Sequence, residues 1–324
     1  MYGKIRLLVV LLAAAAAGLT AAPATDEPDR DADEKSGGPD RLTPALEQRI
    51  RGKAPLGDVQ VDVFWSRGGR ATTARLFGNG VGVWNREKQF RLSRAQVVDV
   101  LKVIERARFG AMPDQFGEDE EGAEHERNEG PRLKGQLVVR AGAVRKETLQ
   151  LVDGEQSQAL ARLMERILEL CHGPARKGVG AASMDEALRL LAAGTFAPEL
   201  LEVTAQRRPD PKGPDGPGAE WTMRLAGLRV SEKPDRSLIL SEKGFHEFAS
   251  LLSDASPGSL PQSLYAASYT DVTVAILKYS RTIAGRRFLG MTPQTHGEKQ
   301  KAFDRIAAAL EALHARLEKE GAPP

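Results

Sequence analysis

Residues 59–84 read VQVDVFWSRGGRATTARLFGNGVGVW, and this stretch decides the fold class. Its apolar residues alternate with polar ones, which is the period of a half-buried strand: Val59, Val61, Val63 and Trp65. The segment 66–69 indicates a turn, and a second strand is expected over 71–77. Gly78-Asn79-Gly80 is a hairpin signal that leads into a third strand at 81–84. The stretch therefore predicts an antiparallel sheet.

A helix with a defined start follows these three strands. Ser93 is the expected N-cap, and Gln96 three residues later completes a capping box. Apolar residues then recur on one face at helical spacing: Val97, Val100, Leu101, Ile104 and Ala107. We expect this face to cover one side of the sheet.

A hairpin and a second helix complete the first half of the chain. Strands are expected at 133–140 and 144–151, around Ala141-Gly142, and a helix over 156–171. We expect Gly173-Pro174 to end this helix, because glycine accepts the left-handed cap and proline cannot continue the helix.

The same order of elements recurs in the second half. The expected elements are strands 200–206 and 221–230, a helix capped by Ser241, a hairpin of 272–279 and 283–289, and a terminal helix over 298–319. A loop rich in proline and glycine, 209–218, separates the first two strands.

The recurrence extends to single residues. A shift of 148 positions places Leu92-Ser93 on Leu240-Ser241, Gly110 on Gly258, and Pro113 on Pro261. Because glycine and proline act through backbone geometry, these matches indicate a duplication. We therefore predict an α+β fold of two tandem modules. Each is an antiparallel sheet with two helices packed on one face, in the order β-β-β-α-β-β-α.

The N-terminus has the three parts of a secretory signal. Lys4 and Arg6 precede the apolar run 7–17, and Ala22-Pro23-Ala24 offers small residues to a signal peptidase. The apolar run is too short for a stable membrane span. We expect cleavage after Ala24 and a periplasmic or secreted mature chain, with an uncleaved anchor as the alternative. No cysteine lies near this site, so we do not expect a lipoprotein.

The domain boundaries follow from these elements. We expect a signal peptide at 1–24, an acidic disordered tether at 25–55, module 1 at 56–173, a linker with a short helix at 174–194, and module 2 at 195–321. In the linker, Ser183 and Glu186 form another capping box, which predicts a helix over 183–193. That helix either lies across one sheet or only separates the modules.

Charge and cysteine content exclude some classes of partner and bond. The chain has 46 basic and 44 acidic residues, so removal of Lys4 and Arg6 leaves a formally neutral mature chain. Nucleic acid is therefore not an expected partner. Segments 25–40 and 114–130 carry net charges of −5 and −7, and one hypothesis is that they fold back and mask a basic site. Cys171, the only cysteine, cannot form an internal disulfide and is expected to be buried and inert.

The layout of the first half resembles emfourin, a bacterial inhibitor of thermolysin-type metalloproteases. The matching features are an opening strand that ends in Ser66-Arg67-Gly68-Gly69, a helix that closes with Ala107-Arg108-Phe109-Gly110-Ala111-Met112-Pro113, a hairpin and a final helix. The resemblance covers about residues 57–171 and extends more weakly to the second half, where the double glycine is absent. It implies the fold and suggests protease inhibition, and no inhibitory residue is carried over from it.

No catalytic, cofactor-binding or metal-binding residues can be assigned from motifs. His246-Glu247 begins like the zinc-protease motif, but Ser250 stands where the second histidine is needed. His125 lies in the acidic stretch, whose spacing is not that of an EF-hand. The glycines at 78–82 join two strands, whereas a nucleotide loop joins a strand to a helix. We interpret Trp65, Trp84 and Trp221 as core residues, and Arg207-Arg208 and Arg286-Arg287 as solvated strand ends.

The leading hypothesis is therefore a non-enzymatic exported binding or interaction protein with an exported or envelope protein as its partner. The expected contact surface is the sheet face that the helices leave open, or the loop 209–218. A protease inhibitor of the emfourin type is the first alternative. An enzyme whose site is assembled from distant residues is the second.

Overall fold

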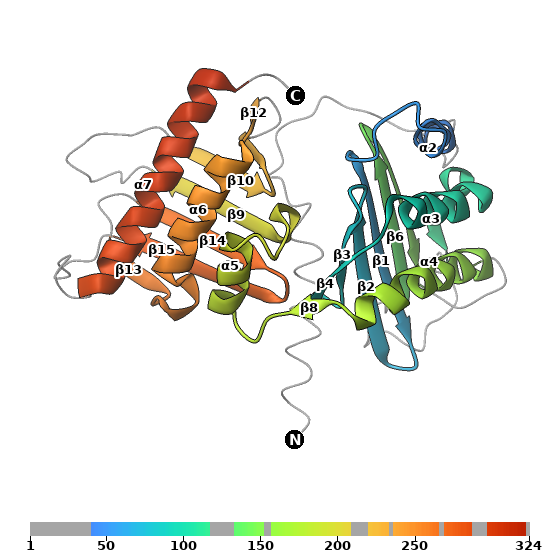
Figure 1. The fold of residues 1–324 in the computed structure, drawn as a ribbon, viewed down its shortest axis with the longest axis horizontal. Coiled ribbons are helices and arrows are strands. Elements are labelled where there is room, and N and C mark those ends of the chain that lie inside the picture. Colours follow the sequence, from blue (N-terminus) through green and yellow to red (C-terminus); the bar gives the residue numbers. More distant parts are fainter. Residues whose placement is uncertain are drawn as a thin grey trace, which may run out of the picture. The chain divides into compact units, whose positions relative to one another are not determined.

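The computed structural model describes residues 40–116, 133–151, 157–208, 220–232, 236–265, 269–286 and 297–321. These residues form a mixed α+β fold with two sheets, each accompanied by helices (Figure 1). The expected α+β class is confirmed at this level. No helix in the described ranges combines the length and the apolar composition needed to cross a bilayer.

The first sheet has the strand order β5-β7-β6-β1-β2-β3-β4-β8. Its strands are β1 (Val59–Arg67), β2 (Arg70–Phe77), β3 (Val81–Trp84), β4 (Lys88–Arg91), β5 (Gln115–Phe116), β6 (Gly135–Ala141), β7 (Val144–Gln150) and β8 (Val179–Gly180). Neighbouring strands are antiparallel except β5 and β7, which are parallel. At its centre, Val61 of β1 stands opposite Leu76 of β2 and Val139 of β6.

The second sheet has the order β12-β11-β10-β9-β14-β15-β13, which is the order of the first sheet with no counterpart of β8. Its strands are β9 (Leu201–Arg208), β10 (Trp221–Ala226), β11 (Arg229–Glu232), β12 (Arg236–Ile239), β13 (Ser263–Tyr265), β14 (Tyr269–Ile276) and β15 (Tyr279–Arg286). Again one edge pair, β13 and β15, is parallel and the others are antiparallel.

Each sheet buries one face against its own helices. The helices are α2 (Leu42–Ile50), α3 (Arg94–Arg106) and α4 (Gln158–Arg176) beside the first sheet, and α5 (Met184–Ala192), α6 (Glu242–Ala255) and α7 (Gly297–Glu320) beside the second. Figure 1 shows α3 and α4 side by side against the first sheet, and α6 and α7 against the second. The buried apolar residues accordingly form two cores, one beside each sheet, and Val81 of β3 belongs to the core of the second sheet.

A short 3-10 turn follows α3 in the first half and α6 in the second. Arg108 and Ser256, which are 148 positions apart, both adopt the left-handed conformation, with φ of 50° and 46°. Each precedes a 3-10 turn, at Phe109–Ala111 and at Pro257–Ser259. The backbone thus reverses at equivalent points of the two halves, although neither residue is glycine.

The strand pattern is richer than the expected β-β-β-α-β-β-α. The structure adds β4 before the helix and β5 after it, and it has β12 and β13 at the matching places of the second half. The single strand expected over 221–230 is wrong: Gly227, with φ of +60°, turns the chain between β10 and β11. A Cβ at Gly227 would sit 3.4 Å from Glu199 Cα.

The tether expected over 25–55 is wrong for its last part, because α2 occupies 42–50. Leu42 and Leu46 enter the first core, which compensates for the cost of ordering this segment. Arg49 of α2 binds Asp58 through Nε and Nη2 and donates from Nη1 to the Ala45 carbonyl. Asp58, just before β1, is thereby joined to the helix.

The expected end of the second helix at Gly173-Pro174 is also wrong. The helix α4 runs on to Arg176 with Pro174 inside it. Pro174 is tolerated because the one backbone donor that it removes lies within the last turn of the helix. The extension also buries Ala175 in the first core. The C-terminal carbonyls are then satisfied by short-range bonds, from Lys177 N to Pro174 O and from Gly178 N to Ala175 O.

The segment between the halves contributes to both of them. Val179–Gly180, as β8, pairs with β4 of the first sheet. The following helix α5 packs on α6 and buries Met184, Ala187, Leu188 and Leu191 in the second core. Ser183 accepts the Glu186 N–H as expected, but the Glu186 carboxylate accepts from Ala182 N, so only half of the predicted capping box forms.

Candidate interaction face

The second sheet presents one open face, built from the residues that alternate with its core positions. On β9 the residues Leu201, Val203 and Ala205 are buried, so Glu202, Thr204 and Gln206 point the other way. The registers place these residues in one face with others that are at least partly exposed: Thr222, Arg224, Ala226, Arg229, Ser231, Ser237, Ile239, Thr273, Ala275, Ser280 and Thr282. We call this set the open face.

The open face is polar because it bears short hydroxyl side chains and one ion pair. Thr273 Oγ1 and Thr282 Oγ1 lie 2.9 Å apart across β14 and β15. Arg224 Nε donates to Glu202 Oε1 at 2.9 Å. Ile239 differs from the rest, since it is a large apolar side chain that is 62% exposed. The face is therefore polar over its centre and apolar at the β12 edge.

The matching face of the first sheet is in part already a protein contact. Val81 on β3 is 1% exposed and belongs to the second core, and Phe77 and Val83 pack against that core. Gln89 on β4 is buried, where its Nε2 donates to the Thr195 carbonyl at 3.2 Å and its Oε1 accepts from Ala197 N at 2.7 Å. Residues of β2, β3 and β4 thus hold the segment that leads into β9.

Further polar contacts cross the same junction. Asn79 donates to Glu199 at 2.6 Å, and Lys278 donates to Glu87 at 3.1 Å. The Tyr279 hydroxyl donates to the Ala181 carbonyl at 2.8 Å. The β14–β15 turn that supplies Lys278 is strained, because Leu277 has a φ of 53°, which is unfavourable for leucine.

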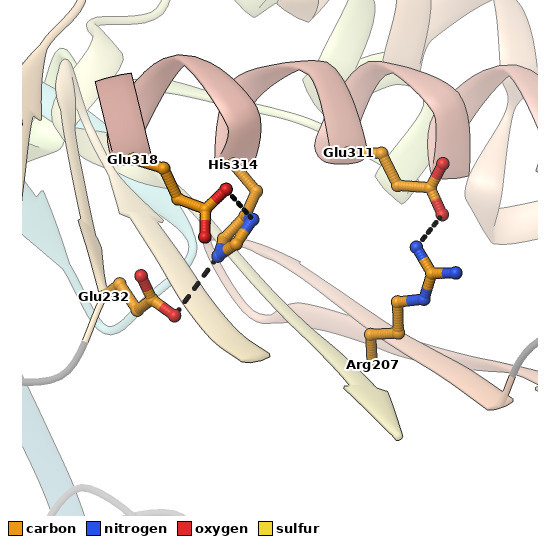
Figure 2. A network of polar contacts seen from close by, with 5 residues as sticks. All are labelled: Arg207, Glu232, Glu311, His314 and Glu318. Atoms are coloured by element: carbon orange, nitrogen blue, oxygen red, sulfur yellow. Dashed lines mark hydrogen bonds and ion pairs between the residues drawn. The ribbon is translucent and has the colours of Figure 1, made fainter. Parts of the chain in front are cut away.

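On the helix-covered side of the second sheet, α7 is held by a buried histidine. The His314 ring stacks on Trp221 with centroids 4.6 Å apart, and its Nε2 lies 3.2 Å from Glu232 Oε1. Figure 2 shows Glu318, one turn along α7, on the other ring nitrogen at 3.9 Å. The expectation that Trp221 is a core residue is confirmed, since it is 6% exposed.

Arg207 adds a second contact between α7 and the sheet. It donates to Glu311 at 3.0 Å, as Figure 2 shows, and its side chain is about one third exposed. The interpretation of Arg207 as a solvated strand end is therefore wrong. Arg208, the next residue and on the opposite face, is exposed as expected. Together, Arg207 and His314 hold α7 over the sheet, which leaves the opposite face open.

The residues that the sequence analysis considered for chemistry do not converge. His246 and Ser250 of α6 line a shallow groove with Asp254 and with Arg305 of α7. His125, the loop 209–218 and Arg287 lie outside the described residues. Among the described side chains, no three metal-ligating groups come together. Cys171 is buried, and burial raises the pKa of its thiol to about 12.

Sequence reasoning missed Gln89, a buried residue at the junction of the two halves. It lies on β4, whose four residues are too few to show the alternation of polar and apolar side chains that predicts a strand. No turn signal marks the ends of this strand. The shift of 148 positions pairs Gln89 with Ser237, which marks them as equivalent positions of one repeat. No sequence signal tells which of the two is covered.

Comparison with known proteins gives no family for this chain. A scan against family models finds no match, and a search of curated proteins finds none either.

Proposed function

We propose that this chain is an exported, non-enzymatic interaction protein made of two copies of one module, and that the open face of the second module binds another protein. The N-terminal pattern of basic, apolar and small residues supports export. The shared strand order and the left-handed residues at 108 and 256 support the duplication.

One observation carries the binding proposal. In the first half, the β3–β4 part of the face is a buried contact made by Val81 and Gln89. The positions 148 residues later are Arg229 and Ser237, and both belong to the open face. Among the described residues, the module therefore uses this surface for a contact within the chain in the first half and leaves it uncovered in the second.

The chemistry of the open face fits a reversible protein contact. The face bears hydroxyl groups and the Arg224–Glu202 pair, and non-obligate interfaces taken as a whole are about as polar as the rest of a protein surface. Ile239 supplies an apolar contact at one side. Such a surface is expected to bind a folded or extended protein partner and to stay soluble without it.

Co-purification tests the proposal. A tagged full-length chain is expressed in its host, and the proteins recovered with it from the exported fraction are identified. The double variant Thr204→Arg and Ser231→Arg should lose the partner, because both side chains are central in the open face. Lys243→Glu on the exposed side of α6 should keep it. Equal recovery with both variants would contradict the proposal.

The resemblance to emfourin supports protease inhibition as a second candidate. The hairpin with Gly68-Gly69, both with positive φ, and the turn after α3 are present in the first half. Titration of a thermolysin-type protease with the full chain measures it directly. Undiminished proteolysis at micromolar protein would remove this candidate for that class.

A further inference from the structure

The free edge of the second sheet differs from the matching edge of the first in one respect. In the first sheet β4 is followed by β8, with Gln89 opposite Val179 and Lys88 opposite Gly180. In the second sheet β12 stands at the position of β4, and no strand of the described residues pairs with its outer side. The same chain therefore shows one such edge occupied and one open.

The direction of the backbone groups on β12 follows from the hydrogen bonds beside it. In an antiparallel pair, successive residues point their N–H and C=O groups alternately toward and away from the neighbouring strand. Leu240 N donates to Leu228 O at 2.8 Å, so Leu240 and Leu238 point toward β11. The backbone groups of Ser237 and Ile239 therefore point outward.

The same reasoning gives the equivalent result for β4. Leu92 N donates to Gly80 O at 2.8 Å, so the backbone of Gln89 points away from β3. That is the residue that stands opposite Val179 of β8. Because Ser237 is 148 positions after Gln89, its outward groups occupy the place where the first sheet accepts an added strand.

The side chains at this edge are suited to a partner strand. Ile239 is 62% exposed, against 44% for Val179, and these are the two exposed large apolar residues of the described ranges. A residue opposite Ile239 on an added strand would lie on the same face of the sheet, within contact distance. Leu238 points to the other face and is half-buried next to the second core.

We propose that the outer edge of β12 binds an extended peptide segment of another protein by strand addition, with an apolar side chain of that segment against Ile239. This inference rests on the proposed function and specifies how part of the partner is bound. The backbone groups of Ser237 and Ile239 supply the hydrogen bonds, and Ile239 supplies selectivity for an apolar residue.

The test uses a phage-displayed library of random peptides, selected on the full mature chain. One enriched peptide is synthesised, and its affinity is measured for the wild type and for three variants. Ile239→Lys should weaken binding by about tenfold or more, because it replaces the apolar contact with a charge. Ile239→Val should keep most of the affinity. Val179→Lys makes the same change at the other exposed apolar strand residue and should have no effect.

Amide exchange gives a second readout of the same complex. The bound peptide should slow exchange at the amides of Ser237 and Ile239, whose N–H groups point outward. Failure to enrich a peptide, equal affinity for Ile239→Lys and the wild type, or protection only at other amides would overturn the proposal.

The two proposals, protein binding by the open face and strand addition at β12, can be tested separately. A partner recovered in the co-purification that is lost with the Thr204→Arg and Ser231→Arg variant but kept with Ile239→Lys would retain the open face and reject strand addition. A partner that neither variant loses would reject the proposed function itself.

Discussion

At the residue scale, the buried thiol gives a clear prediction. Burial raises the pKa of Cys171 to about 12, and only the thiolate reacts quickly with alkylating reagents. At pH 8 the native chain should therefore resist iodoacetamide, and the chain in concentrated denaturant should be labelled fully. Mass spectrometry of the Cys171 peptide measures both. Rapid labelling of the native protein would show that the thiol is accessible.

The Arg49–Asp58 pair gives a prediction about acid. The side-chain hydrogen bond from Arg49, together with its charge, holds the pKa of Asp58 below that of an ordinary aspartate, although burial opposes this. A lowered pKa in the folded state means that the pair stabilises the protein above the unfolded pKa and that this contribution is lost as pH falls through the folded value.

The protection factors of the α2 amides, which are corrected for the intrinsic pH dependence of exchange, should therefore fall when the pH drops below about 4, where aspartates begin to protonate. Asp58→Asn should remove this pH dependence and leave exchange in α2 faster at neutral pH. A wild type and a variant with the same pH profile in α2 would mean that the pair does not hold the helix.

At the element scale, the contribution of the capping box to stability can be measured at the start of α3. Ser93 accepts the Gln96 N–H at 3.3 Å, and Gln96 Oε1 accepts the Ser93 N–H at 2.8 Å. Ser93→Ala should lower the free energy of unfolding by about 1 kcal/mol. Urea denaturation measures the loss, and Ser250→Ala, at an exposed position inside α6, serves as the comparison.

Substitution of Arg108, the left-handed residue after α3, should change the free energy of unfolding in the opposite direction. Arg108 is exposed and has a φ of 50°, a conformation that costs a side-chain-bearing residue about 1 kcal/mol. Arg108→Gly should therefore raise the stability. Arg106→Gly, two residues earlier within the helix, should lower it by about 1 kcal/mol. A loss in both variants would mean that Arg108 makes a favourable contact that outweighs its strain.

The elements that the sequence predicts are those with a long periodic pattern or a defined terminus. Strand β1, the capped start of α3 and the terminal helix were predicted closely, because alternation, capping residues and helical spacing are local signals. The strands β4 and β12 were missed because four residues carry little periodicity. The helix α2 is not predicted because its local signal is weak: Asp40 Oδ1 accepts from the N–H groups of Leu42 and Thr43 at its start. Its other contacts are tertiary, through Leu42, Leu46 and the pair of Arg49 with Asp58.

The candidate interaction face could be predicted only in outline. Alternation tells which residues of a strand share a face, but it does not tell which face the helices cover or where the face is occupied. The contacts of Gln89 with Thr195 and Ala197 join residues more than 100 positions apart, at separations no local pattern encodes. His314 and Glu232, which are 82 positions apart, likewise form a contact that no local pattern encodes.

At the scale of the whole molecule, Gln89 tests how the halves are joined. Its amide satisfies the Thr195 carbonyl and the Ala197 N–H in a buried setting. Gln89→Ala leaves both groups without this partner and should cost about 1–3 kcal/mol. Urea unfolding followed by tryptophan fluorescence measures it, since Trp84 lies in the first half and Trp221 in the second. An unchanged midpoint would mean that water replaces the amide without cost.

The central claim is that the module surface covered at Val81 and Gln89 in the first half is a protein-binding surface in the second. Site-specific photo-cross-linking in the producing cells tests it most directly, with the reactive residue placed at Ser231 of the open face or at Lys243 of α6. The account predicts that Ser231 yields a defined adduct with another protein and that Lys243 yields none. No adduct from Ser231, or the same adducts from both positions, would contradict it.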